Sequence, residues 1–209
     1  MKPQLVRAGL CPGRITLPAP ICASPTSIEC ALLQRRSIRE LGGAPITLSE
    51  LAQLLWAAQG ITDPDGYRTA PSAGSLYPLE VYVLAGRVTD LPTGMYKYTP
   101  HGHTLLKIGE DDRRLALSLA AHDQRYIANA IAVIVFCAVY ERTIGQYGKR
   151  GVQYVHLEAG HAAQNVYLQA VSLQIGTVAV GTFDDAQVIA ALALGDEEHP
   201  LYIMPIGRR

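Results

Sequence analysis

The sequence predicts an α+β fold in which helices and strands follow one another irregularly along the chain. Two observations favour this class: capping patterns precede apolar residues at helical spacing, and short β-branched runs stand between turn residues. A third is a hairpin in the middle of the chain, where two short strands flank the turn at His101–His103. A doubly wound sheet would need regular alternation of strands and helices, so the pattern favours α+β.

The N-terminal part combines an irregular arm with two capped helices. Residues 1–25 carry five prolines and are expected to form the arm, which leaves one domain over residues 26–209. Capping-box patterns start at Thr26 and at Thr47, each with a glutamate three residues later. The second pattern opens a helix with leucines on one stripe, and this helix is expected to end near Gly60.

The rest of the chain holds strands around one long helix. The run Ile131–Val139 is β-branched and apolar, which is typical of a strand buried on both faces. Residues 154–175 form the longest helical segment, with apolar and small residues nearly all round. A helix without a polar face is buried, so we expect it at the centre of the fold or at a subunit interface. Further strands are expected at 80–85, 95–98, 104–108, 177–180 and 201–206, and helices at 111–119 and 185–193.

Composition and charge restrict the classes of function. With 209 residues, 49% of them hydrophobic, the chain is large enough for a real core. Its 18 basic and 18 acidic residues cancel, which disfavours general nucleic-acid binding and mildly favours oligomers. The longest apolar run, Ala130–Tyr140, is too short to span a bilayer, and prolines interrupt any signal-peptide core. We therefore expect a cytoplasmic protein.

No pattern favours a metal or a disulfide. The four cysteines form no C-x-x-C pair, so ordinary thiols are expected. His156 and His161 are off the i, i+4 spacing of a helical metal pair, and we expect core histidines bonded to backbone. The sequence also lacks a dinucleotide-binding loop, a P-loop, a zincin motif and a nucleophile elbow. An enzyme without an evident acid, base or nucleophile often leaves the chemistry to a cofactor.

Three segments carry residues that suit a ligand. Arg35–Arg39 holds three arginines and a serine, which suit a phosphate and equally suit the C-terminal end of a helix. Arg68–Glu80 is a small-residue turn in which Ser72–Ser75 either cradles a flat ligand or forms an ordinary loop. In Val180–Asp185, Gly181 permits close approach of backbone to a ligand, although an ordinary strand-to-helix turn explains the same residues. The first two together suggest a phosphorylated, ring-bearing cofactor.

Six motifs, in this order along the chain, carry a family resemblance. They are Arg35–Arg39, Leu54–Gly60, Ala70–Glu80, Glu158–Asn165, Val180–Asp185 and Pro200–Arg208. From about residue 15 to its end, the chain resembles the nitroreductase-like flavoprotein family, in its SagB-type dehydrogenase branch. The resemblance implies a central mixed or antiparallel sheet flanked by helices. It also implies an obligate homodimer with the 154–175 helix at its centre and FMN in clefts at the subunit interface.

The resemblance also implies roles for individual residues. The family's arginine motif binds the phosphate and ribityl chain of FMN, here with Arg35, Arg36 and Ser37, and Arg208 is a further phosphate ligand. Arg39 and Ser75 correspond to family positions at the pyrimidine side of the flavin ring. Gly181 corresponds to the position whose backbone N–H approaches N5. The remaining cofactor-binding candidates are Ser72, Ala73, Gly74, Gln164, Val180 and Thr182.

The implied chemistry is hydride transfer through N5 of the flavin. Oxidation of a small molecule or modified peptide ranks first, because the SagB-type branch oxidises azoline rings in ribosomally made peptides. NAD(P)H-driven reduction of nitro compounds or quinones ranks second. Some relatives use a Lys-Tyr pair as base, but this chain has Gln146-Tyr147, so Tyr147 and Lys149 are the catalytic candidates. The missing lysine leaves a third alternative, a non-catalytic flavin-binding scaffold subunit of a biosynthetic complex.

Overall fold

A computed structural model describes residues 13–209, and it confirms the α+β class with an antiparallel central sheet. The strands of this sheet are β1 (Arg14–Thr16), β3 (Leu79–Ala85), β5 (Gly94–Thr99), β6 (Thr104–Gly109), β7 (Ala132–Val139), β8 (Ile175–Thr177) and β9 (Glu198–Arg208). Their order is β1-β6-β5-β3-β7-β9-β8, and every neighbouring pair is antiparallel. Two further strands, β2 (Ile46–Thr47) and β4 (Val88–Thr89), form a separate parallel pair.

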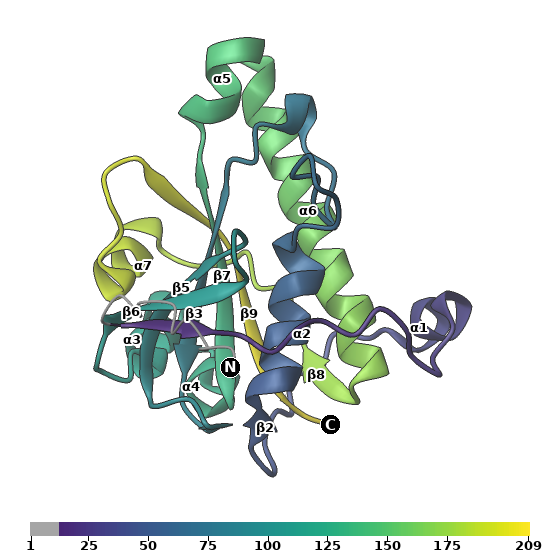
Figure 1. The fold of residues 1–209 in the computed structure, drawn as a ribbon. Coiled ribbons are helices and arrows are strands. Elements are labelled where there is room, and N and C mark those ends of the chain that lie inside the picture. The colour runs from purple at the N-terminus through teal and green to yellow at the C-terminus, as the bar shows by residue number, and fades with distance from the viewer. Residues whose placement is uncertain (1–12) are drawn as a thin grey trace, which may run out of the picture.

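Helices cover both faces of the sheet (Figure 1). One face carries α2 (Leu48–Gln59) and α6 (Arg150–Ser172), and the other carries α3 (Arg114–Ala120), α4 (Arg125–Asn129) and α7 (Asp185–Leu192). Helix α1 (Ile28–Gln34) stands away from the body, and α5 (Glu141–Tyr147) lies at the top of the view in Figure 1. Within residues 13–209, no helix combines the length and the apolar character needed to cross a membrane.

Strand β7 joins the two cores that lie on either face of the sheet. All eight of its residues are buried, which confirms the prediction of a strand buried on both faces. Ile134 and Phe136 belong to the core under α2 and α6, whereas Val133 and Val135 belong to the core under α3, α4 and α7. Each fully buried aliphatic or aromatic side chain contributes roughly 1.5–3 kcal/mol, so this strand is a main source of stability.

Helix α6 is the longest helix, as predicted, but only one side of it is buried in the single chain. Val155 and Ala159 pack into the core, whereas Leu157 is 51% exposed. The expectation of two core histidines is wrong, because His156 and His161 are both exposed. The expectation of a helix without a polar face is also corrected, because the exposed side carries Gln153 and the two histidines beside Leu157.

Two capping predictions have different outcomes. The Thr47 capping box is confirmed: its hydroxyl accepts the Glu50 N–H at 3.2 Å, and the Glu50 carboxylate accepts the Thr47 N–H at 2.7 Å. The box predicted at Thr26 is wrong, because the N-cap of α1 is Ser27, which accepts the Cys30 N–H at 3.1 Å, and the residue at the third helical position is then a cysteine. Ser and Thr are both favourable N-caps, so the sequence does not separate adjacent candidates.

Part of the segment predicted as an irregular arm is a strand. β1 pairs with β6, with Ile15 opposite Leu105. The chain then passes over α2, where the Ile21 N–H donates to Gln53 Oε1 at 2.8 Å and Gln53 Nε2 donates to the Ile21 carbonyl at 3.0 Å. Residues 1–12 of the arm lie outside the described residues. The strand expected at 177–180 is also corrected, since β8 ends at Thr177 and only a single bridge joins Val180 to Ile203.

Removing the Thr47 cap is expected to destabilise the protein measurably. Thr47→Ala leaves the Glu50 N–H without its side-chain acceptor, and we expect a loss of about 1 kcal/mol in the free energy of unfolding. The measurement is chemical denaturation at one protein concentration. Ser49→Ala, at an exposed position in the first turn of the same helix, is the matched control and is expected to change stability by less than about 0.5 kcal/mol. Equal effects of the two substitutions would contradict the capping assignment.

Candidate functional site

The turn before β3 has a backbone suited to close approach by a ligand. φ is positive at Gly74 (+61°), Ser75 (+53°) and Tyr77 (+47°), a region that non-glycine residues seldom adopt. Ser72 holds the turn, because its carbonyl accepts the Ser75 N–H at 3.1 Å and its hydroxyl accepts the Tyr77 N–H at 2.9 Å. Among residues 13–209, the N–H groups of Ala73 and Gly74 have no acceptor. The turn therefore offers free donors at its surface.

Tyr147 lies at this turn, although it is 73 residues further along the chain than Gly74. A Cβ added to Gly74 would be 2.9 Å from the Tyr147 hydroxyl and 3.2 Å from Oε1 of Gln146. The Tyr147 ring packs edge-on against Tyr154 of α6, with 5.2 Å between ring centres. The structure thus brings Tyr147 together with the predicted Ser72–Ser75 segment, and it shows why position 74 needs a glycine.

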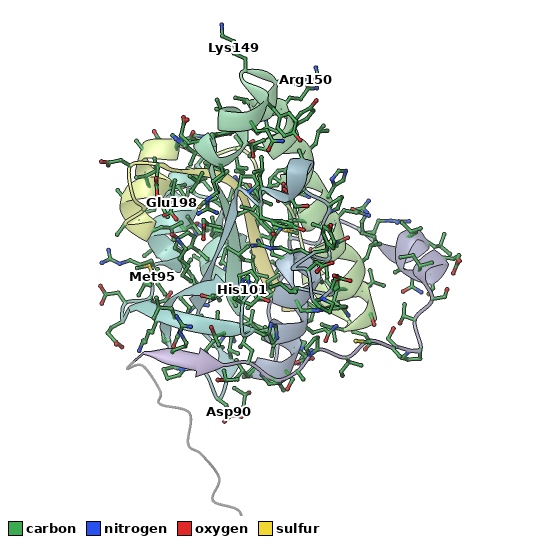
Figure 2. All side chains as sticks on the ribbon, turned by 45° about the horizontal axis from the view of Figure 1, so that its top comes forward. Asp90, Met95, His101, Lys149, Arg150 and Glu198 are labelled. Carbon is green, nitrogen blue, oxygen red and sulfur yellow. The ribbon has the colours of Figure 1, made fainter. Side chains whose placement is uncertain are left out.

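Lys149 is not brought to the turn in this chain. It is exposed in the link between α5 and α6, and Figure 2 shows it extending away from the fold. Neighbouring Arg150 also lies at this edge of the molecule (Figure 2). Of the two catalytic candidates, only Tyr147 lies beside the turn.

A buried carboxyl group lies next to the same turn. Glu158 of α6 is 3% exposed, and its Oε1 has no hydrogen-bond partner among the described residues. Burial raises the pKa of Glu158 to about 7, and the Ser72 hydroxyl and the charge of Arg68 oppose this rise only in part. No sequence pattern predicts a role for Glu158 by itself. The available signal was a single carboxylate on a helix of mainly small and apolar residues.

The predicted phosphate-binding arginines contact α6 farther along its length. The Arg35 guanidinium carbon lies 5.0 Å from the centre of the Tyr167 ring, and the Ser37 hydroxyl is 3.1 Å from the Tyr167 hydroxyl. Arg36 donates to two backbone carbonyls at the end of α1. None of Arg35, Arg36 and Arg39 forms a salt bridge with another described residue. Forked donors without a carboxylate partner suit a phosphate group.

Tyr167 also joins these arginines to the segment after β8. Its hydroxyl accepts the Ala179 N–H at 2.7 Å, while the Ile38 N–H donates to the Thr177 carbonyl at 2.9 Å. The structure therefore places Arg35–Arg39 beside residues 177–179. Sequence analysis did not single out Tyr167, because a tyrosine among the apolar residues of a helix carries no local signal of a distant contact.

Gly181 and Thr182 directly follow this contact. Val180 pairs with Ile203 of β9, and the next two residues are exposed. The Thr182 carbonyl accepts from Gln124 Nε2 at 3.2 Å. Within the described part of the chain, the N–H groups of Gly181 and Thr182 have no acceptor. Free backbone N–H groups of this kind can donate hydrogen bonds to a ring nitrogen or a carbonyl oxygen of a flavin.

Arg208 is engaged with a carboxylate in this chain. Its Nη1 and Nη2 lie 2.6 and 2.9 Å from the two carboxylate oxygens of Glu50, and Nη2 also donates to the Pro45 carbonyl at 3.1 Å. Its backbone N–H donates to Gly42 at 3.0 Å, which places the chain end near the arginine segment. To contact a phosphate, the Arg208 side chain would have to leave Glu50.

The two halves of the candidate site lie along one helix. Glu158 is beside the turn and Tyr167 is beside the arginines, and nine residues of α6 correspond to about 13 Å. Between them, Gln164 is half-buried and Asn165 Nδ2 donates to the Thr69 carbonyl at 3.1 Å. The spacing suits an elongated ligand with an anionic end and a planar end, and the donor groups suit FMN.

Comparison with known proteins identifies the family. The family model described as "Nitroreductase family" matches residues 32–208. The chain belongs to the nitroreductase family. A Methanocaldococcus jannaschii protein, provisionally named nitroreductase MJ1384, is 47% identical over 182 residues, covering 87% of this chain and 91% of the relative. A crystal structure of a Ralstonia eutropha JMP134 protein, also provisionally named a nitroreductase, has a TM-score of 0.83 at 31% identity and covers 99% of this chain and 95% of that chain.

Two more distant relatives of this nitroreductase-family protein have more specific names. The microcin B17-processing protein McbC of Escherichia coli is 25% identical over 155 residues, 71% of this chain and 57% of McbC. The NADPH:FMN oxidoreductase of Vibrio harveyi has a TM-score of 0.62 at 23% identity, covers 87% of this chain and 68% of that chain, and shares the fold. Family membership establishes an oxidoreductase, and members of the family generally bind FMN.

Replacing Glu158 is expected to change how stability depends on pH. Because the folded pKa of about 7 lies above the ordinary value of 4.5, the unfolded chain releases this proton at lower pH than the folded protein does. The contribution of Glu158 therefore becomes less favourable as pH rises from about 4.5 to about 7, by on the order of 3 kcal/mol. The difference in free energy of unfolding, Glu158→Gln minus native, is thus expected to be more positive at about pH 8 than at about pH 5.

The measurement is the free energy of unfolding of both proteins at the two pH values. Glu197→Gln, which alters an exposed carboxylate, is the control and should leave the pH profile unchanged. A stability difference between Glu158→Gln and the native protein that is the same at both pH values would contradict the assignment.

Proposed function

We propose that this protein is an FMN-dependent oxidoreductase that transfers a hydride through N5 of the flavin. The observation that carries the proposal is the arrangement along α6, with arginines that have no carboxylate partner among residues 13–209 at one end and the open small-residue turn at the other. Membership of a family that generally binds FMN supports it. When bound, FMN supplies two-electron redox chemistry.

The residues of this chain would bind and orient the cofactor. Arg35, Arg36 and Ser37 would hold the phosphate and the ribityl chain, as charge-assisted hydrogen bonds to phosphate require. The free N–H of Gly181 would face N5, and Ser75 and Arg39 the pyrimidine edge, where positive charge stabilises a reduced ring. Remaining contacts would come from Ser72, Ala73, Gly74, Gln164, Val180, Thr182 and, once free of Glu50, Arg208.

The proposal includes a homodimer with the cofactor at the subunit interface. Apolar side chains of the arm and α1 are unusually exposed in the single chain: Ile21 (69%), Ile28 (55%), Leu32 (55%) and Leu33 (74%). Leu157 on the open side of α6 is also exposed. Three large apolar side chains exposed on one short helix suit an interaction site, and a second copy would cover them.

Within this function, we favour oxidation of a substrate of the SagB type. The McbC similarity supports this branch, and Tyr147 at the turn is positioned to donate or accept a proton. The names of the M. jannaschii and R. eutropha relatives support the second candidate, NAD(P)H-driven reduction of nitro compounds or quinones. A flavin-binding scaffold without turnover is the third candidate, because Lys149 points away from the turn.

An anaerobic half-reaction separates the candidates. Protein loaded with FMN is mixed with NADH or NADPH, and flavin absorbance is followed in a stopped-flow instrument. We expect slow or no bleaching by either nucleotide, with complete bleaching by dithionite as the control. Fast bleaching would favour the reductase, and turnover of the flavin by any physiological donor would exclude the scaffold.

Loss of Arg36 is expected to weaken FMN binding and to leave the fold intact. A charge-assisted hydrogen bond contributes about 1.5–3 kcal/mol, so Arg36→Ala should raise the dissociation constant roughly 10- to 100-fold. Flavin fluorescence titration gives the affinity, and circular dichroism checks the fold. Arg125→Ala removes an exposed arginine elsewhere and is the matched control. Unchanged flavin affinity in Arg36→Ala would remove this residue from the phosphate site.

A further inference from the structure

A polar cavity of about 210 Å³ lies among residues that are not cofactor candidates. It is formed by the end of α2, the facing parts of β3 and β5, the turn after β5, and α5. Its volume is that of several water molecules, at about 30 Å³ each, or of a small organic anion. The polar side chains that line it are Gln59, Arg68, Glu80, Lys97, Tyr98, Thr99, His101 and Arg142.

Three cations line this cavity, and two of them are neutralised by carboxylates. Lys97 Nζ lies 3.2 Å from Glu80 and 2.6 Å from Glu198. Arg142 also pairs with Glu80. Arg68 forms no salt bridge with any residue among 13–209. The salt-bridged groups thus have two positive charges against two negative ones, and Arg68 adds a third positive charge outside any of these salt bridges.

The Arg68 guanidinium is partly buried and incompletely hydrogen-bonded. Its Nη1 donates to Gln59 Oε1 at 2.8 Å, and its carbon lies 4.1 Å from the centre of the Tyr77 ring. Its Nε is buried and has no acceptor among the described residues. Burial lowers the pKa of Arg68, and the charges of nearby groups, Glu158 and Glu80 among them, oppose this only in part; neither carboxylate forms a salt bridge with Arg68. A desolvated charge without a counter-ion is costly, which indicates a missing anion.

Gln59 supplies a second unsatisfied donor to the same cavity. Its side chain is fully buried at 0% exposure, and its Nε2 has no acceptor within the described part of the chain. Its Oε1 is already occupied by Arg68. Buried donors are almost always paired in folded proteins, so two unpaired N–H groups beside one cavity point to an acceptor inside it.

We propose that this cavity binds a small oxyanion, a carboxylate or a phosphate group, with Arg68 and Gln59 as its donors. An oxyanion is the chemistry that fits, because both unmet groups are N–H donors and the charge left over is positive. The proposal is independent of FMN, since none of the lining residues is a cofactor candidate.

Tyr77 would link the bound oxyanion to the candidate cofactor turn. Tyr77 stacks under Arg68, its N–H donates to Ser72, and its carbonyl accepts from Arg142 at 3.1 Å. An anion held by Arg68 therefore fixes the side chain that supports the strained Tyr77 backbone. Such a site suits either the carboxylate of a substrate or a free phosphate that regulates the turn.

Isothermal titration calorimetry tests the proposal directly. Protein is titrated with succinate and, separately, with inorganic phosphate, at constant ionic strength with chloride as the control anion. Saturable binding in the millimolar range or tighter is expected for at least one of them. Tighter binding of succinate identifies a carboxylate site, and tighter binding of phosphate identifies a phosphate site. The absence of saturable binding of both would overturn the proposal.

Two substitutions locate the binding. Arg68→Gln should weaken it roughly 10- to 100-fold, whereas Arg125→Gln, at an exposed arginine, should not. Gln59→Glu places a fixed carboxylate where Gln59 Oε1 now lies 2.8 Å from Arg68. Gln59→Glu should abolish oxyanion binding and should raise the melting temperature measured without ligand. This variant provides the test even if Arg68→Gln fails to fold. Unaltered binding in Gln59→Glu would contradict the proposal.

Arg36→Ala distinguishes the cavity from the proposed cofactor site. Oxyanion affinity should be unchanged in this variant, with or without FMN present. If the affinity falls in Arg36→Ala and is retained in Arg68→Gln, the anion occupies the arginine segment at the end of α1, and the cavity proposal is wrong. Failure of the protein to bind FMN would contradict the proposed function and would leave the outcome of these titrations unaffected.

Discussion

The burial of one side of α6 against the sheet is the constraint on which the candidate site depends. Alanine and valine side chains of this helix share one core with β3 and β7, and close packing of small residues permits little movement. The helix therefore holds Glu158 beside the small-residue turn and Tyr167 beside the arginines at a constant separation. Loops supply most of the proposed ligand contacts, and α6 sets the distance between them.

Charge is distributed unevenly although the chain as a whole is neutral. Two acidic residues near the site are paired within the chain, Glu50 with Arg208 and Glu80 with Lys97 and Arg142. Arg68 and the Arg35–Arg39 segment have no such partners among residues 13–209. Zero net charge disfavours a uniformly basic surface, but it conceals local positive excess. That excess is where anionic ligands are expected.

The sequence predicted features that depend on neighbouring residues and missed those that depend on distant ones. The run at 131–139, the Thr47 cap and the hairpin around His101–His103 follow from local periodicity and turn chemistry, and the structure contains all three. The contacts of Glu158 with Ser72 and of Tyr167 with Ser37 join residues 86 and 130 positions apart in the sequence. No local pattern encodes such contacts. Family motifs pointed to the segments, and only the structure shows that α6 connects them.

Arg208 illustrates how a ligand can compete with a contact inside the protein. Its carboxylate partner, Glu50, also accepts the Thr47 N–H, so the same side chain caps α2 and holds the chain end. The Arg208–Glu50 pair is bidentate and partly buried, so it is stronger than an ordinary surface ion pair, but a phosphate carries more charge than one carboxylate. Transfer of Arg208 from Glu50 to a phosphate would therefore exchange one charge-assisted contact for another and would leave the cap of α2 in place. An arginine occupied in the single chain is thus compatible with a role in binding FMN.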